Sequence, residues 1–123
     1  GKKKMIEMAK EDVLKGLKKC KRLAKQALLA SNLTDNPTYW NDQAVSRRQT
    51  YDQLMESIGD KGLEYTYRVA SSDYFLLKHI DPTSDPVQAG RKQALEMFFT
   101  IIGKSADRSE RIERTEDSPS VVG

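Results

Sequence analysis

The chain has 123 residues and a net charge of +3, and 37% of its residues are hydrophobic while 32% are charged. This length supports one modest hydrophobic core and excludes two domains of ordinary size, and no run of about 18 apolar residues is present to span a membrane. The single cysteine, Cys20, excludes an internal disulfide and a cysteine-based zinc site. One cysteine and no signal-peptide pattern predict a cytoplasmic protein, and the initial Gly1 is typical of the scar of a cleaved tag.

The charge is divided unevenly along the chain. Residues 1–25 carry ten Lys or Arg and three Asp or Glu, whereas residues 26–123 carry 11 Lys or Arg and 15 Asp or Glu. Segregation of this kind predicts a polyanionic partner for the N-terminal part.

Apolar residues recur at steps of three and four between about Met5 and Ser31, which predicts an amphipathic helix. The segment 31–37 is expected to form a turn. Within it, Asn36 is placed to cap a second helix that has Pro37 at its first position.

We expect the second helix to run to about Ile58 and to end at Gly59. Its predicted inner face consists of Trp40, Ala44, Tyr51, Leu54, Met55 and Ile58. Asp60 is then expected to cap a third helix, which ends before Asp81. Residues 63–69 also alternate with the period of a strand, so a strand is the alternative there. The helix is preferred because its period continues for two further turns.

Asp85 and Pro86 are expected to begin a fourth helix, which ends at about Ile102 before Gly103. Apolar side chains cover more than half of its circumference, whereas packing on one side needs an arc of roughly 100°. Two explanations remain open. The helix either contacts another subunit as well as its own core, or it is the central helix of the bundle. The residues of the predicted subunit contact are Phe98, Phe99 and Ile102.

The sequence therefore predicts an all-α fold, a small bundle of about four helices with a long basic N-terminal helix. Residues 1–103 are expected to form the single helical domain. Residues 104–123 are expected to form a charged, largely disordered tail.

Cations gather on the side of the first helix opposite its apolar stripe, namely Lys4, Lys15, Lys18, Lys19, Arg22 and Lys25. Side chains three and four residues apart on a helix lie about 5–6 Å apart, which is comparable to the spacing of phosphates along a nucleic-acid strand. These residues are the predicted binding site for double-stranded DNA. Because lysine lacks the fork geometry of arginine, we expect affinity more than sequence specificity.

Two alternatives to DNA binding remain open for this face. It is either the solvated side of an ordinary helix or a surface for anionic membranes. The membrane is not expected, because small Ala and Cys residues stand where an interfacial helix carries large apolar anchors.

No set of residues typical of an enzyme is present. One histidine and one cysteine do not supply a nucleophilic pair or a transition-metal site, and no phosphate-binding glycine loop occurs. We therefore expect no catalytic residue, no metal and no cofactor. His79 is expected to cap the end of the third helix. Tyr39 and Trp40 are expected to fasten the second helix to the core rather than to stack on bases.

A divalent-ion site was also considered at three carboxylates, Asp73, Asp81 and Asp85. Helix caps and Asp-Pro turns account for two of them without a metal, so the metal is not expected.

Several short segments in the rest of the chain form a further pattern. Leu33-Thr34-Asp35 precedes the Trp40 helix, and Gly62-Leu63, Asp85-Pro86, Gly103 and the run 105–112 follow. The pattern resembles the small terminase subunits that tailed bacteriophages use in DNA packaging. That family has a Ser/Thr-Pro step before an arginine-containing run, whereas here no proline follows Ser105. The arginines of this run, Arg108 and Arg111, are separated by two residues rather than one.

The resemblance implies a non-catalytic homo-oligomeric ring that recognises viral DNA in the host cytoplasm and engages a large terminase subunit, a separate ATPase and nuclease. The first helix would be the DNA element, and the helix around Phe98 and Phe99 would be the subunit contact. The alternative function is a dimeric helical interaction module whose basic helix binds an acidic protein partner. A small enzyme is the third and least favoured possibility.

Overall fold

The computed structural model describes residue 6, residues 8–77 and residues 79–106. In these ranges the chain forms four α-helices and one short 3-10 helix, and it contains no strand. The elements are α1 (Lys10–Ala30), η1 (Ser31–Leu33), α2 (Pro37–Lys61), α3 (Leu63–Leu76) and α4 (Pro86–Ile102). The predicted all-α bundle is confirmed, and the strand considered for 63–69 is wrong because these residues belong to α3.

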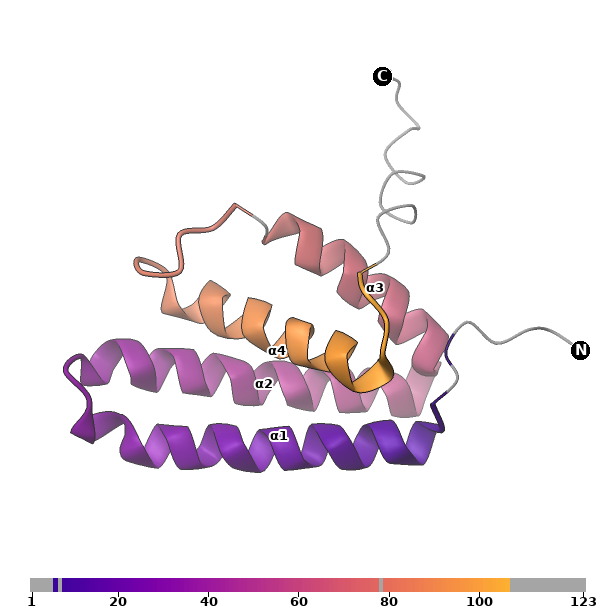
Figure 1. Cartoon of the computed structure of the whole chain (residues 1–123), viewed down its shortest axis with the longest axis horizontal. Helices are drawn as coiled ribbons and strands as arrows, with labels where there is room; N and C mark the ends of the chain where they lie inside the picture. Colours follow the sequence, from indigo (N-terminus) through magenta and orange to yellow (C-terminus); the bar gives the residue numbers. More distant parts are fainter. Residues whose placement is uncertain (1–5, 7, 78, 107–123) are drawn as a thin grey trace, which may run out of the picture.

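Helix α2 is the centre of the bundle and contacts the other three helices. Helix α1 lies antiparallel beside it on one side, while α4 and then α3 lie on the other side (Figure 1). Helix α4 likewise contacts α1, α2 and α3, so the central position that the sequence offered as one explanation for its wide apolar arc is shared by α2 and α4.

Two stripes of buried residues on α2 explain its position. One stripe is apolar and includes Ala44, Tyr51 and Ile58, the inner face that the sequence predicted. The other consists of small or polar residues, Gln43, Ser46 and Thr50, each of which is also buried. Positions spaced by three and four residues share a helix face, so α2 packs on two sides.

The polar stripe of α2 is joined to α4 by hydrogen bonds. The Gln43 amide donates to Oε1 of Gln93 over 2.6 Å, and the Ser46 hydroxyl donates to the carbonyl of Val87. The two helices come very close at Gly90. A Cβ at this residue would lie 2.9 Å from Cβ of Ser46 and closer still to the backbone oxygen of Gln43. Only glycine lets the two backbones approach this far.

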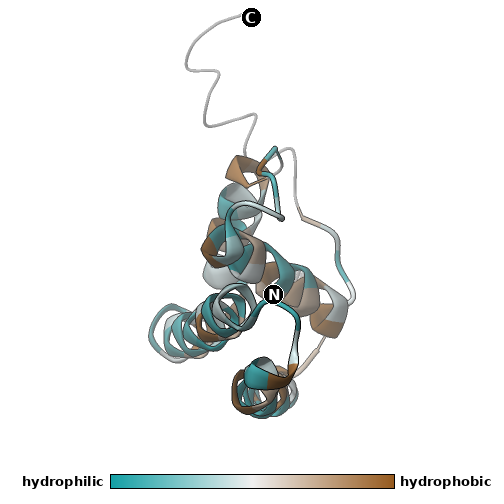
Figure 2. Cartoon of the chain, turned by 90° about the vertical axis from the view of Figure 1, so that its left-hand side faces the viewer, coloured by the Kyte–Doolittle hydropathy of each residue, from teal (hydrophilic) through white to brown (hydrophobic). Residues whose placement is uncertain are grey.

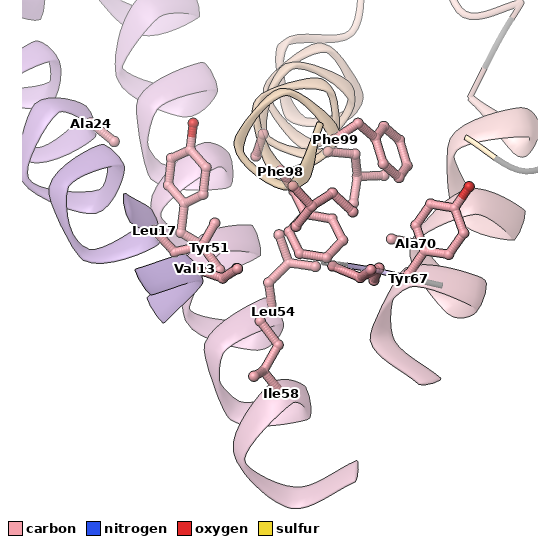
Figure 3. Packing of buried hydrophobic residues seen from close by; sticks show 14 of the residues in the cluster. Val13, Leu17, Ala24, Tyr51, Leu54, Ile58, Tyr67, Ala70, Phe98 and Phe99 are labelled. Carbon is pink, nitrogen blue, oxygen red and sulfur yellow. The ribbon is translucent and has the colours of Figure 1, made fainter. Parts of the chain in front are cut away.

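The aromatic residues of α4 fill the space between α2 and α3. Phe98 and Phe99 are 0% and 7% exposed, and Ile102 is also buried. The ring of Phe99 lies edge-on to that of Tyr67 of α3, at a centroid distance of 6.1 Å (Figure 3). It also lies edge-on to the ring of Tyr74, at 5.6 Å. The predicted subunit contact at Phe98, Phe99 and Ile102 is therefore wrong, because these side chains form the core of their own chain.

Several helix ends differ from the predicted ones. Helix α1 begins at Lys10 rather than near residue 5, although Ile6 is buried and its backbone N–H donates to Glu64. Helix α2 continues through Gly59 and ends at Lys61, since Gly62 has the positive φ of 94° that glycine favours. Asp60 is thus no cap.

Helix α3 ends at Leu76, well before Asp81, so the exposed His79 lies beyond the helix that it was expected to cap. Two predicted caps and the predicted end of the fourth helix are confirmed. The side chain of Asn36 accepts from the backbone N–H of Tyr39, that of Asp85 accepts from Gln88, and Gly103 ends α4 in the left-handed conformation.

The helical domain extends a little past its predicted end. The hydroxyl of Tyr67 donates to the carbonyl of Ser105 over 2.6 Å, and the Lys104 ammonium lies 5.5 Å from the centre of the Tyr67 ring. Ala106 packs against the core. The rest of the predicted tail, residues 107–123, lies outside the described residues.

We expect opposite effects from adding a methyl group at two helical glycines. Gly90→Ala should lower the free energy of unfolding by about 1–3 kcal/mol, because the added Cβ forces α2 and α4 apart. Gly59→Ala should raise it by about 0.5–1 kcal/mol, because this position in α2 has no atom within 4 Å of the added Cβ and alanine is the better helix former. Urea denaturation followed by circular dichroism measures both, and equal stability of the two variants would contradict the close approach at Gly90.

Candidate nucleic-acid interface

The packing of α1 on α2 fixes the direction of the basic side chains. Val13, Leu17 and Ala24 are fully buried, so the opposite side of α1 faces outward. All the predicted cations in the described part of α1 are exposed there, namely Lys15, Lys18, Lys19, Arg22 and Lys25. Lys4, the sixth predicted residue, lies outside the described residues. We call the five exposed cations the basic face.

The basic face has the length of a short stretch of nucleic-acid backbone. The helical rise of about 1.5 Å per residue places Lys15 and Lys25 about 15 Å apart along the axis. A strand of duplex DNA passes about four phosphates over this distance, at roughly 3.4 Å of axis per phosphate. The acidic residues of α1, Glu11 and Asp12, lie in its first turn, ahead of the basic face.

Lys21 has a different role from its neighbours. Its ammonium lies 2.7 Å from a carboxylate oxygen of Asp52 on α2, with the two side chains 31% and 48% exposed. This ion pair joins α1 to α2 at the surface and contributes at most about 1 kcal/mol. Lys21 was not among the predicted DNA-binding residues, and its ammonium is paired with Asp52.

Arg47 on α2 adds a cation that the sequence pattern did not reveal. It donates from Nε to the Gln43 side chain over 3.0 Å, and its charge acts on Cys20 of α1, as does that of Lys19. Arg47 and Lys19 therefore lie near the same part of the seam between the two helices. Only the pairing of α1 with α2 brings these residues together.

The thiol of Cys20 lies at this seam beside Tyr51. Partial burial raises the pKa of Cys20, against the opposing effects of a hydrogen bond from Tyr51 and of the charges on Arg47 and Lys19. Burial likewise raises the pKa of Tyr51 to about 12. Both groups are neutral at pH 7, and a protonated thiol is a poor nucleophile.

Large apolar side chains are exposed where α1 ends and α2 begins. Leu29, Leu33 and Trp40 are 79%, 88% and 44% exposed. Figure 2 views the chain from the end at which α1 is joined to α2. The expectation that α1 presents only small apolar residues outside the core is thus wrong, and Trp40 does not belong to the inner face of α2. The hydroxyl of Tyr39 donates to the carbonyl of Pro82 in the exposed segment before α4, so Tyr39 is held by this segment rather than by the core. We call Leu29, Leu33 and Trp40 the apolar tip.

The three carboxylates considered for a metal each have another partner. Asp73 pairs with Arg91 at 2.8 Å, Asp81 accepts from the backbone and hydroxyl of Thr83, and Asp85 caps α4. The two hydrogen bonds from Thr83 lower the pKa of Asp81. Residues 6, 8–77 and 79–106 contain no cluster of three His, Cys, Asp or Glu suited to a metal ion.

Comparison of the chain with protein-family models, with curated proteins and with solved structures found no match in any of the three. Within the described part of the chain, no helix has both the length and the apolar character needed to cross a membrane.

The environment of Cys20 predicts its reactivity. The pH midpoint of alkylation by iodoacetamide should lie higher in the folded protein than in the urea-unfolded chain, because burial disfavours the thiolate. Tyr51→Phe should move the midpoint higher still, since the variant lacks the hydroxyl that lowers the thiol pKa. Rates measured by mass spectrometry from pH 7 to pH 11 test this, and a midpoint at or below that of the unfolded chain would contradict the described seam.

Proposed function

We propose that this chain is a non-catalytic DNA-binding protein that holds the phosphate backbone of double-stranded DNA on the outer side of α1. One observation carries the proposal. Five exposed cations occupy one side of α1, and Val13, Leu17 and Ala24 on its other side are fully buried. This packing fixes the orientation of the helix, so the cations stay accessible to a partner. Binding releases the counterions condensed on the phosphates, which makes the interaction favourable and dependent on salt.

The composition of the basic face favours affinity over sequence recognition. Four of the five cations are lysines, which act as point charges, and only Arg22 has the planar fork that reads guanine. A single face of this size binds weakly. Repetition of the face in an oligomer would strengthen binding through a high effective concentration.

The resemblance to small terminase subunits supports a more specific proposal, a phage DNA-packaging adaptor. In this role an oligomeric ring would hold viral DNA and engage the large terminase subunit. Since Phe98, Phe99 and Ile102 are buried, subunits of such a ring would have to meet through other residues. The apolar tip is the described surface with the most exposed leucines, and it lies outside the core.

The apolar tip also favours a second candidate, binding of an acidic protein partner. Leu29 and Leu33 follow the basic face along the chain, and protein interfaces combine an apolar centre with a polar rim. Exposed leucines make no favourable contact with nucleic-acid phosphates. This candidate corresponds to a helical interaction module rather than a DNA-packaging protein.

Neutralising the basic face should abolish DNA binding. A variant with glutamine at Lys15, Lys18, Arg22 and Lys25 should lose at least tenfold in affinity for a 20-base-pair duplex at low salt, because each lost charge removes one neutralised phosphate. For the unmodified chain, about four neutralised phosphates give a slope near −3.6 for log affinity against log salt. Fluorescence anisotropy measures both quantities.

A matched control separates the basic face from net charge. Glutamine at Lys61, Arg68, Lys92 and Lys104 removes the same number of charges from α2, α3, α4 and the segment that follows. This control should keep most of the affinity. Equal losses in both variants, with unchanged helical circular dichroism, would contradict the assignment to α1. Tight binding of an acidic peptide with no binding of duplex would favour the protein partner.

Native mass spectrometry tests the packaging proposal separately. An oligomer of many copies that retains a short duplex is the expected result. A monomer that still binds the duplex would refute the ring but leave the DNA-binding proposal intact.

A further inference from the structure

A cavity of about 200 Å³ lies where α2, α3 and α4 meet. Its lining residues are Thr50, Gln53, Leu54, Ser57, Thr66, Val69, Ala70, Asp73, Arg91 and Leu95. None of them belongs to α1, so the cavity is separate from the basic face. Its size is below the roughly 300–1,000 Å³ of sites for drug-sized ligands, which limits an occupant to a small molecule.

The floor of the cavity is apolar. Leu54, Ala70 and Leu95 are buried there, while Val69 on α3 is 43% exposed and lies at the rim. An apolar body inserted between these side chains would lose its contact with water, which is the main source of affinity in small sites.

The hydroxyl groups of the cavity have no protons left to offer a ligand. Thr66 donates to the carbonyl of Gly62, so the 2.6 Å bond between Thr66 and Ser57 uses the proton of Ser57. Thr50 donates to the carbonyl of Ser46. The donors must therefore come from the other end of the cavity.

That end is built around Arg91. The guanidinium donates from Nη1 to Oε1 of Gln53 over 3.1 Å and from Nη2 to Oδ2 of Asp73 over 2.8 Å. Two groups beside it keep hydrogen-bonding capacity, the NH₂ of Gln53 as a donor and Oδ1 of Asp73 as an acceptor. Because Gln53 and Asp73 bond to the same guanidinium, this end of the cavity offers both a donor and an acceptor, which suits a molecule that carries a carbonyl and an N–H.

The charge of the cavity is balanced without a ligand. Arg91 and Asp73 neutralise each other, and no other lining residue is charged. A charged ligand would lose its hydration without gaining an opposite charge, which is costly. The cavity therefore favours an uncharged occupant.

We propose that the cavity between α2, α3 and α4 binds a small, neutral, planar molecule that carries an N–H and a carbonyl on one edge. Aromatic amides and heterocyclic lactams have this chemistry. The ring lies on Leu54, Ala70 and Leu95, and the polar edge meets Gln53 and Asp73.

Titration of the ¹⁵N-labelled full chain with benzamide and 2-pyridone tests the site. Saturable shifts of the amides in 50–57, 66–73 and 91–95 are expected, with a dissociation constant on the order of 1 mM. Benzoate, which has the shape of benzamide but a negative charge, should bind at least tenfold more weakly. Equal binding of benzoate would overturn the proposed ligand class.

Two variants place the binding in the cavity. Ala70→Leu should fill the floor and Val69→Trp should cover the rim, and each should weaken benzamide binding at least tenfold, whereas Gly59→Ala on an open part of α2 should leave it unchanged. If Ala70→Leu does not fold, Val69→Trp decides, because residue 69 lies at the surface. No saturable shift with either probe, or shifts that survive Val69→Trp, would overturn the site. Loss of DNA binding in the basic-face variant bears on none of these results.

Discussion

The close approach of α4 to α2 at Gly90 is the constraint on which the rest of the structure depends. A Cβ at this residue would meet the α2 backbone, so any larger side chain would separate the two helices. Their contact buries Gln43 and Ser46, whose polar groups are satisfied by Gln93 and the Val87 carbonyl. Among the described residues, no buried side-chain nitrogen or oxygen lacks a hydrogen-bond partner. A polar helix face can be buried in this way only when each of its groups is paired.

This contact also separates the two candidate sites. Helix α1 packs against one side of α2 and also against α4, and its cations face outward. The cavity lies on the other side of α2, where α3 and α4 meet it. The two sites would respond differently to conditions. Binding to the basic face weakens as salt screens exposed charges, whereas binding in the cavity depends on apolar burial and is almost independent of salt.

Sequence patterns failed where a residue's surroundings come from another helix. The apolar arc of α4 is wide because α4 packs against α1, α2 and α3 within one chain, so Phe98 and Phe99 need no second subunit. The polar stripe of α2 has the composition of a solvated face, and nothing local marks Thr50 as buried. The exposure of Leu29, by contrast, follows from the sequence, since at 100° per residue it lies among the cations of α1 and opposite the buried stripe.

By itself, the sequence determined the four helices, the caps at Asn36, Asp85 and Gly103, and the outward basic face of α1. Each of these depends on residues within one or two helical turns, where periodicity and capping chemistry act. Only the tertiary structure decided which helix is central, which aromatic residues face inward and where a cavity remains. Those features depend on how closely two helices approach, and a single glycine on α4 fixes that distance through atoms that lie more than 40 residues away in the chain.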